Sequence, residues 1–69
     1  MLNKFNQMLK ELREERGLST RKLSLETNIP KSNFSCWETG KSLPSIEAVI
    51  QLALYFGVTC GQLLGVEEY

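Results

Sequence analysis

The amino-acid sequence predicts an all-α fold, in which five short helices pack into one compact unit. Apolar residues recur at helical spacing, and serine, threonine and glycine residues stand where helices begin and end. No stretch alternates between apolar and polar residues as a strand would. The 69 residues are enough for one domain, which would cover residues 1–69, and too few for two.

The first helix is predicted at residues 3–16. Its amphipathic stripe follows the spacing i, i+3, i+4 and i+7 and consists of Phe5, Met8, Leu9 and Leu12. Asn3 is a suitable N-cap, and Gly17 stands where the left-handed conformation that commonly ends a helix is expected.

The second helix is predicted at residues 19–27. Ser19 is a good N-cap, and Leu18 and Leu23 are spaced to pack together across the first turn. The helix ends near residue 27, because Asn28 tolerates left-handed geometry and Pro30 drives the residue before it out of the helical region.

The third helix is predicted at residues 31–39, with Gly40 after its end. Its two sides differ, because Phe34 and Trp37 share one apolar face. The opposite face is small and polar and carries Ser32, Ser35, Cys36 and Thr39.

The fourth helix, residues 46–56, begins after Ser45 and is apolar nearly all round. A helix of this kind is expected to be buried from several sides. The fifth helix is short, because Thr59 and Gln62 are spaced to form a capping box at its start and Gly65 ends it.

The composition excludes several kinds of site. The sequence contains no histidine and no aspartate, which rules out histidine bases, Ser-His-Asp triads and the common zinc ligand sets. Cys36 and Cys60 match neither a disulfide scaffold nor a metal motif. The Glu, Lys, Cys and Tyr residues form no recognisable catalytic pattern, so enzymatic activity is not expected. No bound metal or cofactor is expected either.

The longest strongly apolar stretch, residues 52–58, is far too short to cross a bilayer, so no membrane association is expected. The N-terminal residues lack the apolar core and the small-residue cleavage site of an export signal. A cytoplasmic location is therefore the expectation.

The formal net charge is zero, but the charges are segregated along the chain. Residues 16–41 carry five basic and two acidic side chains, a local +3, whereas residues 42–69 carry three acidic side chains and no basic one. A concentrated basic patch is the electrostatic signature of nucleic-acid binding. A solvated face that became basic by chance explains five charges equally well.

The link between the second and third helices consists of Asn28, Ile29 and Pro30 alone. So short a link, with Ile29 held between the helices, favours a steep crossing over an antiparallel hairpin. Ser24 is small enough to let the two helices approach closely. Periodicity by itself is equally compatible with a generic corner between two helices.

Several landmarks occur in a specific order: RxxRGLS at 13–19, Leu23, WETGKSLPS at 37–45, and FGVT followed by LLG at 56–65. With these landmarks, residues 5–65 resemble the XRE-like helix-turn-helix family of phage Cro and CI-type repressors and their bacterial relatives. The resemblance implies a lambda-repressor-like domain with its helix-turn-helix at about residues 19–39. It also implies a transcriptional regulator, with repression as the expected outcome, whose helix at 31–39 reads double-stranded DNA in the major groove.

The resemblance assigns a role to each residue of the motif. Positions that meet base edges in the family correspond to Lys31, Ser32 and Cys36, with Ser35 adjacent. Positions that touch phosphate correspond to Thr20, Asn33, Thr39 and Lys41. Four residues depart from the family pattern, at the turn glycine, a frequent glutamine, a charged position and an acidic position: Asn28, Thr20, Leu25 and Gly61.

Other interpretations of these residues stay open. Ser32 and Ser35 could equally be ordinary solvent-exposed serines without a contact to DNA. Asn33 has the groups for a bidentate bond with adenine, but asparagine early in a helix is also common as a local cap. The thiol of Cys36 suits contact with a thymine methyl group, and a redox role is the alternative.

Arg13 and Glu38 correspond to positions that form an ion pair between the first and third helices in the family. Arg13 flanks the apolar stripe of the first helix, and Glu38 stands next to Trp37. The pair is therefore expected to be structural.

The small local charge predicts weak DNA binding by one copy, and two copies on a palindromic operator would add their contacts. A homodimer is therefore expected, using apolar residues near the acidic end: Leu52, Tyr55, Leu63, Leu64 and Val66. Burial in the core is the alternative for these residues and the better one for Leu63. As an alternative function, Leu25 and the acidic tail would suit a protein-interaction module such as the antitoxin of a toxin–antitoxin pair.

Overall fold

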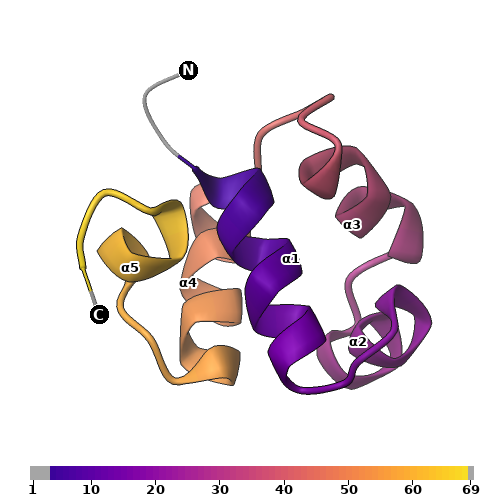
Figure 1. Ribbon diagram of the computed structural model, residues 1–69. Helices are drawn as coiled ribbons and strands as arrows, with labels where there is room; N and C mark the ends of the chain where they lie inside the picture. The colour runs from indigo at the N-terminus through magenta and orange to yellow at the C-terminus, as the bar shows by residue number, and fades with distance from the viewer. Residues whose placement is uncertain (1–3, 69) are drawn as a thin grey trace.

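The computed structural model describes residues 4–68 and contains five α-helices and no strand within that range (Figure 1). The predicted all-α fold of five helices is confirmed. In chain order the helices are α1 (Phe5–Glu15), α2 (Thr20–Thr27), α3 (Lys31–Glu38), α4 (Ile46–Phe56) and α5 (Cys60–Leu64). The expected cap at Asn3 lies outside the described residues.

Most helix ends follow the predicted local signals. The hydroxyl of Ser19 accepts a hydrogen bond from the Lys22 amide at the start of α2. Thr59 and Gln62 form both bonds of the capping box at α5, as the spacing predicted. Asn28 ends α2 with a φ of 61°, the left-handed conformation that asparagine tolerates better than other side chains do.

The core lies between α1 and the other helices. Phe5, Leu9 and Leu12 point inward from α1. Trp37 packs edge-on against both Phe34 and Phe5, with ring centroids 5.5 and 5.9 Å apart. This packing fixes the back of α3 against α1, so the orientation of α3 depends on the core itself.

The helices are arranged around α1, with α2 and α3 on one side and α4 and α5 on the other (Figure 1). The packing of α3 against both α1 and α2 agrees with this view. None of the helices in residues 4–68 is long and apolar enough to cross a membrane.

The prediction that α4 is buried from several sides is wrong. One face of α4 is buried, through Val49, Leu52, Ala53 and Phe56. The neighbouring side of the helix, which carries Ile46, Ile50 and Leu54, is exposed. Leu52 and Leu63 belong to the core, so neither is available to a second subunit. Val66 is exposed, and Tyr55 and Leu64 are half-buried.

Candidate nucleic-acid interface

The turn between α2 and α3 is fixed by hydrogen bonds from small polar side chains. Ser24 donates from its hydroxyl to the Ile29 carbonyl at 2.6 Å. Thr27 donates to the Leu23 carbonyl at 2.7 Å and accepts from the Ile29 amide at 3.4 Å. Ile29 is buried, so the turn has both an apolar anchor and satisfied backbone groups. These contacts therefore hold the turn between the two helices in one conformation.

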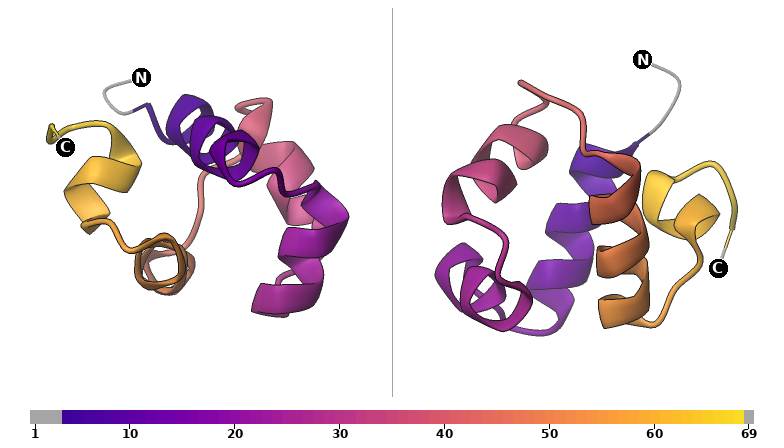
Figure 2. Two further views of the ribbon diagram at one scale, coloured as in Figure 1. Left: turned by 60° about the horizontal axis from the view of Figure 1, so that its bottom comes forward. Right: turned by 180° about the vertical axis from the view of Figure 1, so that it is seen from behind.

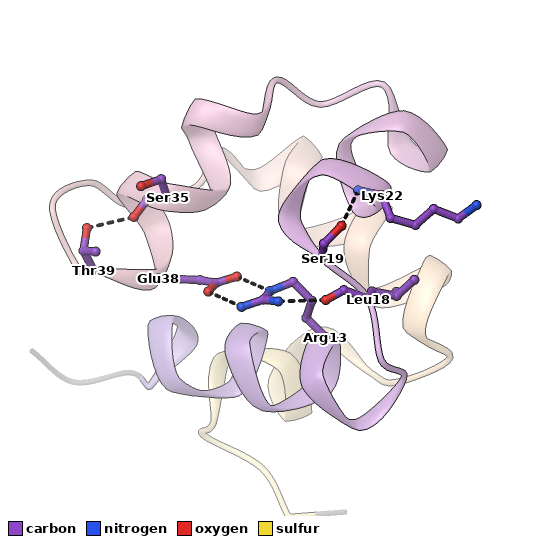
Figure 3. A network of polar contacts seen from close by, with 7 residues as sticks. All are labelled: Arg13, Leu18, Ser19, Lys22, Ser35, Glu38 and Thr39. Atoms are coloured by element: carbon purple, nitrogen blue, oxygen red, sulfur yellow. Dashed lines mark hydrogen bonds and ion pairs between the residues drawn. The ribbon is translucent and has the colours of Figure 1, made fainter.

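Arg13 connects three segments of the chain (Figure 3). Its Nε lies 2.8 Å from Oε2 of Glu38, and its Nη2 donates to Oε1 of the same carboxylate at 3.0 Å. Its Nη1 donates to the Leu18 carbonyl at 2.7 Å, one residue before the cap of α2. The side chain thus ties α1 to the end of α3 and to the start of α2.

The Arg13–Glu38 pair is largely removed from solvent, with 14% and 10% of the two side chains exposed. The hydrogen bond to Glu38 raises the pKa of Arg13 above its ordinary value, against the opposing effect of burial. Because both carboxylate oxygens accept from one planar guanidinium, the pair fixes an orientation as well as a distance.

The outward face of α3 is small and polar. Phe34 and Trp37 are buried on the inner face. The side chains of Asn33 and Cys36 lie half-buried at the flank. The exposed positions of the helix and its C-cap are Lys31, Ser32, Ser35 and Thr39.

Thr39 and Lys41 lie at the end of this face. The Thr39 hydroxyl donates to the Ser35 carbonyl at 2.8 Å (Figure 3). It also lies 3.3 Å from the Cys36 carbonyl. Its single proton is therefore already used within the helix end. The Lys41 amide donates to the Cys36 carbonyl at 2.9 Å, which holds the exposed Lys41 beside α3.

The first turn of α2 carries Thr20, which is half-buried directly after the cap. The early amides of a helix lack intrahelical acceptors, and the helix dipole adds positive potential there. The hydroxyl of Ser19 accepts from the amide of Lys22. The amides of Thr20 and Arg21 stand at the first two positions of the helix, where the helix itself offers no acceptor. Such a turn can bind an anion such as a phosphate.

The basic residues of segment 16–41 do not all face outward as one patch. Arg16 donates to the Phe56 carbonyl at the end of α4, and its guanidinium lies 5.1 Å from the centroid of the Phe56 ring. Lys22 lies 3.6 Å from Glu26 across one helical turn. Among residues 4–68, the basic side chains of this segment that bind neither a carboxylate nor a main-chain carbonyl are Arg21, Lys31 and Lys41. The contact of Arg16 with α4 was not predicted from the sequence, because no local pattern indicates a partner so far along the chain.

Two further contacts hold α2 against α4, and the sequence did not predict either. Gln51 donates to the Thr27 carbonyl at 2.6 Å. The Tyr55 hydroxyl donates to Glu26, and this hydrogen bond raises the pKa of the Tyr55 phenol above its ordinary value. Together with Arg13, these contacts fix α2 at both of its ends.

The described residues contain no group of three or more His, Cys, Asp or Glu side chains that could hold a metal ion. The features of the interface are two helices joined by the short turn at residues 28–30, an exposed face of α3 that is polar and uncharged apart from Lys31, and the start of α2 beside it. This combination defines a helix-turn-helix, the class in which one helix crosses the DNA backbone and the next enters a groove.

Comparison with known proteins agrees with this class. Residues 6–68 match the family model described as a helix-turn-helix domain. The chain belongs to this family, and the predicted resemblance to its XRE-like members is confirmed.

Two curated relatives and one solved structure illustrate the similarity. Over 64 residues the chain is 33% identical to the HTH-type transcriptional activator BcrR of Enterococcus faecalis, covering 93% of this chain and 31% of that protein. Over 60 residues it is 38% identical to the HTH-type transcriptional regulator AnsR of Bacillus subtilis (strain 168), covering 87% and 52%. The chain thus spans about half or less of each relative.

The crystal structure of a transcriptional regulator from Listeria innocua superimposes with a TM-score of 0.87 at 26% identity. The match covers all of this chain and 64% of that one. The similarity therefore includes the arrangement of all five helices.

Proposed function

We propose that the chain binds double-stranded DNA sequence-specifically as a transcriptional regulator, with α3 in the major groove. Residues 1–69 would act as one DNA-binding unit with the helix-turn-helix at about residues 19–39. The observation that carries the proposal is the exposed polar face of α3, held beside the first turn of α2 by Arg13. A rigid pair of helices in this arrangement suits groove entry by one and backbone contact by the other.

Base contacts are assigned to Lys31, Ser32, Ser35 and Cys36. The two hydroxyl groups can donate to or accept from base edges, and the thiol suits van der Waals contact with a thymine methyl group. Three of the four side chains are small and uncharged, which permits close approach to the groove. Specificity then depends on shape and on DNA deformability as well as on direct hydrogen bonds.

Phosphate contacts are assigned to Thr20, Asn33, Thr39 and Lys41. The position of Thr20 in the first turn of α2 supports its assignment, because the free amides beside it attract the same anion. Lys41 adds a charge at the other end of α3. Thr39 would donate to a phosphate only by releasing the Ser35 carbonyl, so its contribution is expected to be the smallest.

We also propose that two copies bind one palindromic operator. Within residues 16–41 of each copy, the three cations without a partner, Arg21, Lys31 and Lys41, supply few phosphate contacts, and binding at physiological salt requires more. A two-fold symmetric pair places two α3 helices in successive major grooves, about 34 Å apart.

Repression is the proposed outcome, because occupancy of a promoter is enough to block transcription and requires only DNA binding. The relative named as an activator indicates that the opposite outcome also occurs among similar proteins. A reporter gene placed behind the operator distinguishes the two, since its expression falls for a repressor and rises for an activator.

The test of DNA binding is selection of a preferred sequence from a random pool, followed by titration of that DNA and an unrelated duplex of equal length. Replacement of Ser32 by Ala is expected to lower the preference for the selected site about fivefold for each bound copy, from the loss of a base contact of about 1 kcal/mol. Lys10→Ala, on the exposed side of α1, is the control and should leave the preference unchanged. Equal affinity of the wild-type protein for both duplexes would contradict the proposal.

A further inference from the structure

Two polar side chains of α4 reach across to the end of α2. The Nε2 of Gln51 donates to the Thr27 carbonyl at 2.6 Å, and the Tyr55 hydroxyl donates to Glu26. The two donors stand four residues apart and therefore on one side of α4. Seen nearly along α4, α2 and α3 lie together on one side of it and α5 lies on the other (Figure 2, left). The hydrogen bonds of Gln51 and Tyr55 to α2 are named the α4 clamp.

The α4 clamp acts directly before the turn that leads into α3. The last four carbonyls of a helix have no donor within it, and the carbonyl of Thr27, the last residue of α2, is one of them. The hydroxyl of the same residue donates to the Leu23 carbonyl and accepts from the Ile29 amide inside the turn. Gln51 therefore holds, through Thr27, a residue on which the turn itself is built.

The direct connection between α2 and α4 is narrow. α2 packs broadly against α3 but meets α4 at few points. Arg13 ties the start of α2 to α1, and Ser24 closes the turn from within, but neither side chain bonds to α4. Within residues 4–68 no other side-chain hydrogen bond joins α2 to α4. Packing in the shared core brings the helices together, and the directional bonds of the clamp fix the end of α2.

We infer that Gln51 and Tyr55 are positioning residues for DNA recognition, which act through the end of α2 on the placement of α3. The inference rests on the proposed function, because recognition of DNA by α3 is what requires a fixed corner. Base contacts by α3 and phosphate contacts by the first turn of α2 have to form together, so a corner that is free to move loses specific contacts first. Nonspecific attraction to phosphate depends on charge, which neither residue carries, and tolerates such movement.

The first test measures the turn without DNA. Gln51→Met keeps the length of the side chain and removes its donor, and Tyr55→Phe removes only the hydroxyl. Because one net hydrogen bond shifts an equilibrium about fivefold, the double variant should speed hydrogen exchange of the Asn28 and Ile29 amides about tenfold relative to the amides of α1. Both amides bond within the segment that the clamp holds.

The second test measures DNA recognition at a temperature where every variant is fully folded. The double variant should lower the preference for a selected sequence over an unrelated duplex at least about fivefold, the equivalent of one base contact. Its affinity for the unrelated duplex and its salt slope should keep the wild-type values, since no charge is changed. Gln7→Met makes the same replacement on the exposed side of α1 and is the matched control in both tests.

The outcomes separate a positioning role from a purely structural one. Faster exchange in the turn together with a lowered preference supports the inference. Unchanged exchange in the turn overturns it, and so does faster exchange with an unchanged preference, because the clamp would then contribute to stability alone. A wild-type protein that prefers no DNA sequence overturns the proposed function, and the exchange result then decides by itself whether α4 positions the corner.

Discussion

At the scale of single residues, Arg13 connects the proposed reading helix to α1 and to the start of α2. Its guanidinium donates to three acceptors, two on Glu38 and one on Leu18, which belong to different parts of the motif. A lysine could not reproduce this fork, because an ammonium group lacks the planar arrangement of donors. The geometry of the corner between α2 and α3 therefore depends on a residue of α1.

Replacement of Glu38 by Ala is predicted to lower the free energy of unfolding by about 3 kcal/mol. The change leaves Arg13 charged and mostly buried without its partner. The free-energy cost of an unpaired buried charge is larger than the net stabilisation that the intact pair provides. Urea unfolding measures the effect. Lys22→Ala, which breaks the exposed pair with Glu26, is the control and should cost about 0.3–0.5 kcal/mol. Equal stability of Glu38→Ala and the wild type would refute a structural role for the pair.

Single residues differ in how far their roles can be predicted from the sequence. The caps at Ser19 and Thr59 were predicted correctly because each hydroxyl binds an amide three residues away. Arg16 was counted with the DNA-facing charges, but it binds the Phe56 carbonyl 40 residues along the chain. A local pattern contains no information about such a partner, because the contact exists only after α1 and α4 pack.

At the scale of elements, the burial of α4 was predicted incorrectly for the same reason, because a local sequence pattern does not show which helices will pack against it. Its sequence is apolar nearly all round, and hydrophobicity alone predicted burial on all sides. The structure covers only the face that carries Val49, Leu52, Ala53 and Phe56. How much of an apolar helix is buried depends on how many other helices pack against it, and a fold of five short helices provides few such neighbours.

The turn between α2 and α3 gives a testable prediction at this scale. Asn28 adopts a φ of 61°, so Asn28→Ala should cost about 1 kcal/mol of stability, because alanine is strained there. Asn28→Gly should keep the stability within about 0.5 kcal/mol of the wild type, since glycine adopts this conformation freely. Thermal unfolding of the two variants measures the difference. Identical melting of both would mean that the turn does not keep its left-handed conformation in solution.

At the scale of the whole molecule, the decisive quantity is the distribution of charge over the fold. The sequence predicted a basic patch between residues 16 and 41. The period of the third helix correctly predicted a small polar face with Ser32, Ser35 and Thr39 exposed, whereas Cys36 is half-buried. In the fold, Arg16 binds the end of α4 and Lys22 pairs with Glu26. The cations left for DNA are fewer than the sequence suggests, so each should have a measurable share of the salt dependence.

The salt dependence of DNA binding should therefore be moderate and should respond to a single lysine. If Arg21, Lys31 and Lys41 each meet one phosphate in both copies, the plot of log affinity against log salt has a slope of about −5. Lys41→Ala should make that slope less steep by about 2, because a symmetric pair loses two phosphate contacts.

The loss at Lys41 should also be equal for operator and unrelated DNA, since a phosphate contact contains no sequence information. Fluorescence anisotropy between about 50 and 200 mM salt measures both quantities over a range in which such contacts change affinity strongly. Lys10→Ala removes the same charge from the exposed side of α1 and should leave the slope as it is. A slope that Lys41→Ala and Lys10→Ala alter equally would place Lys41 outside the interface and attribute the charge effect to the molecule as a whole.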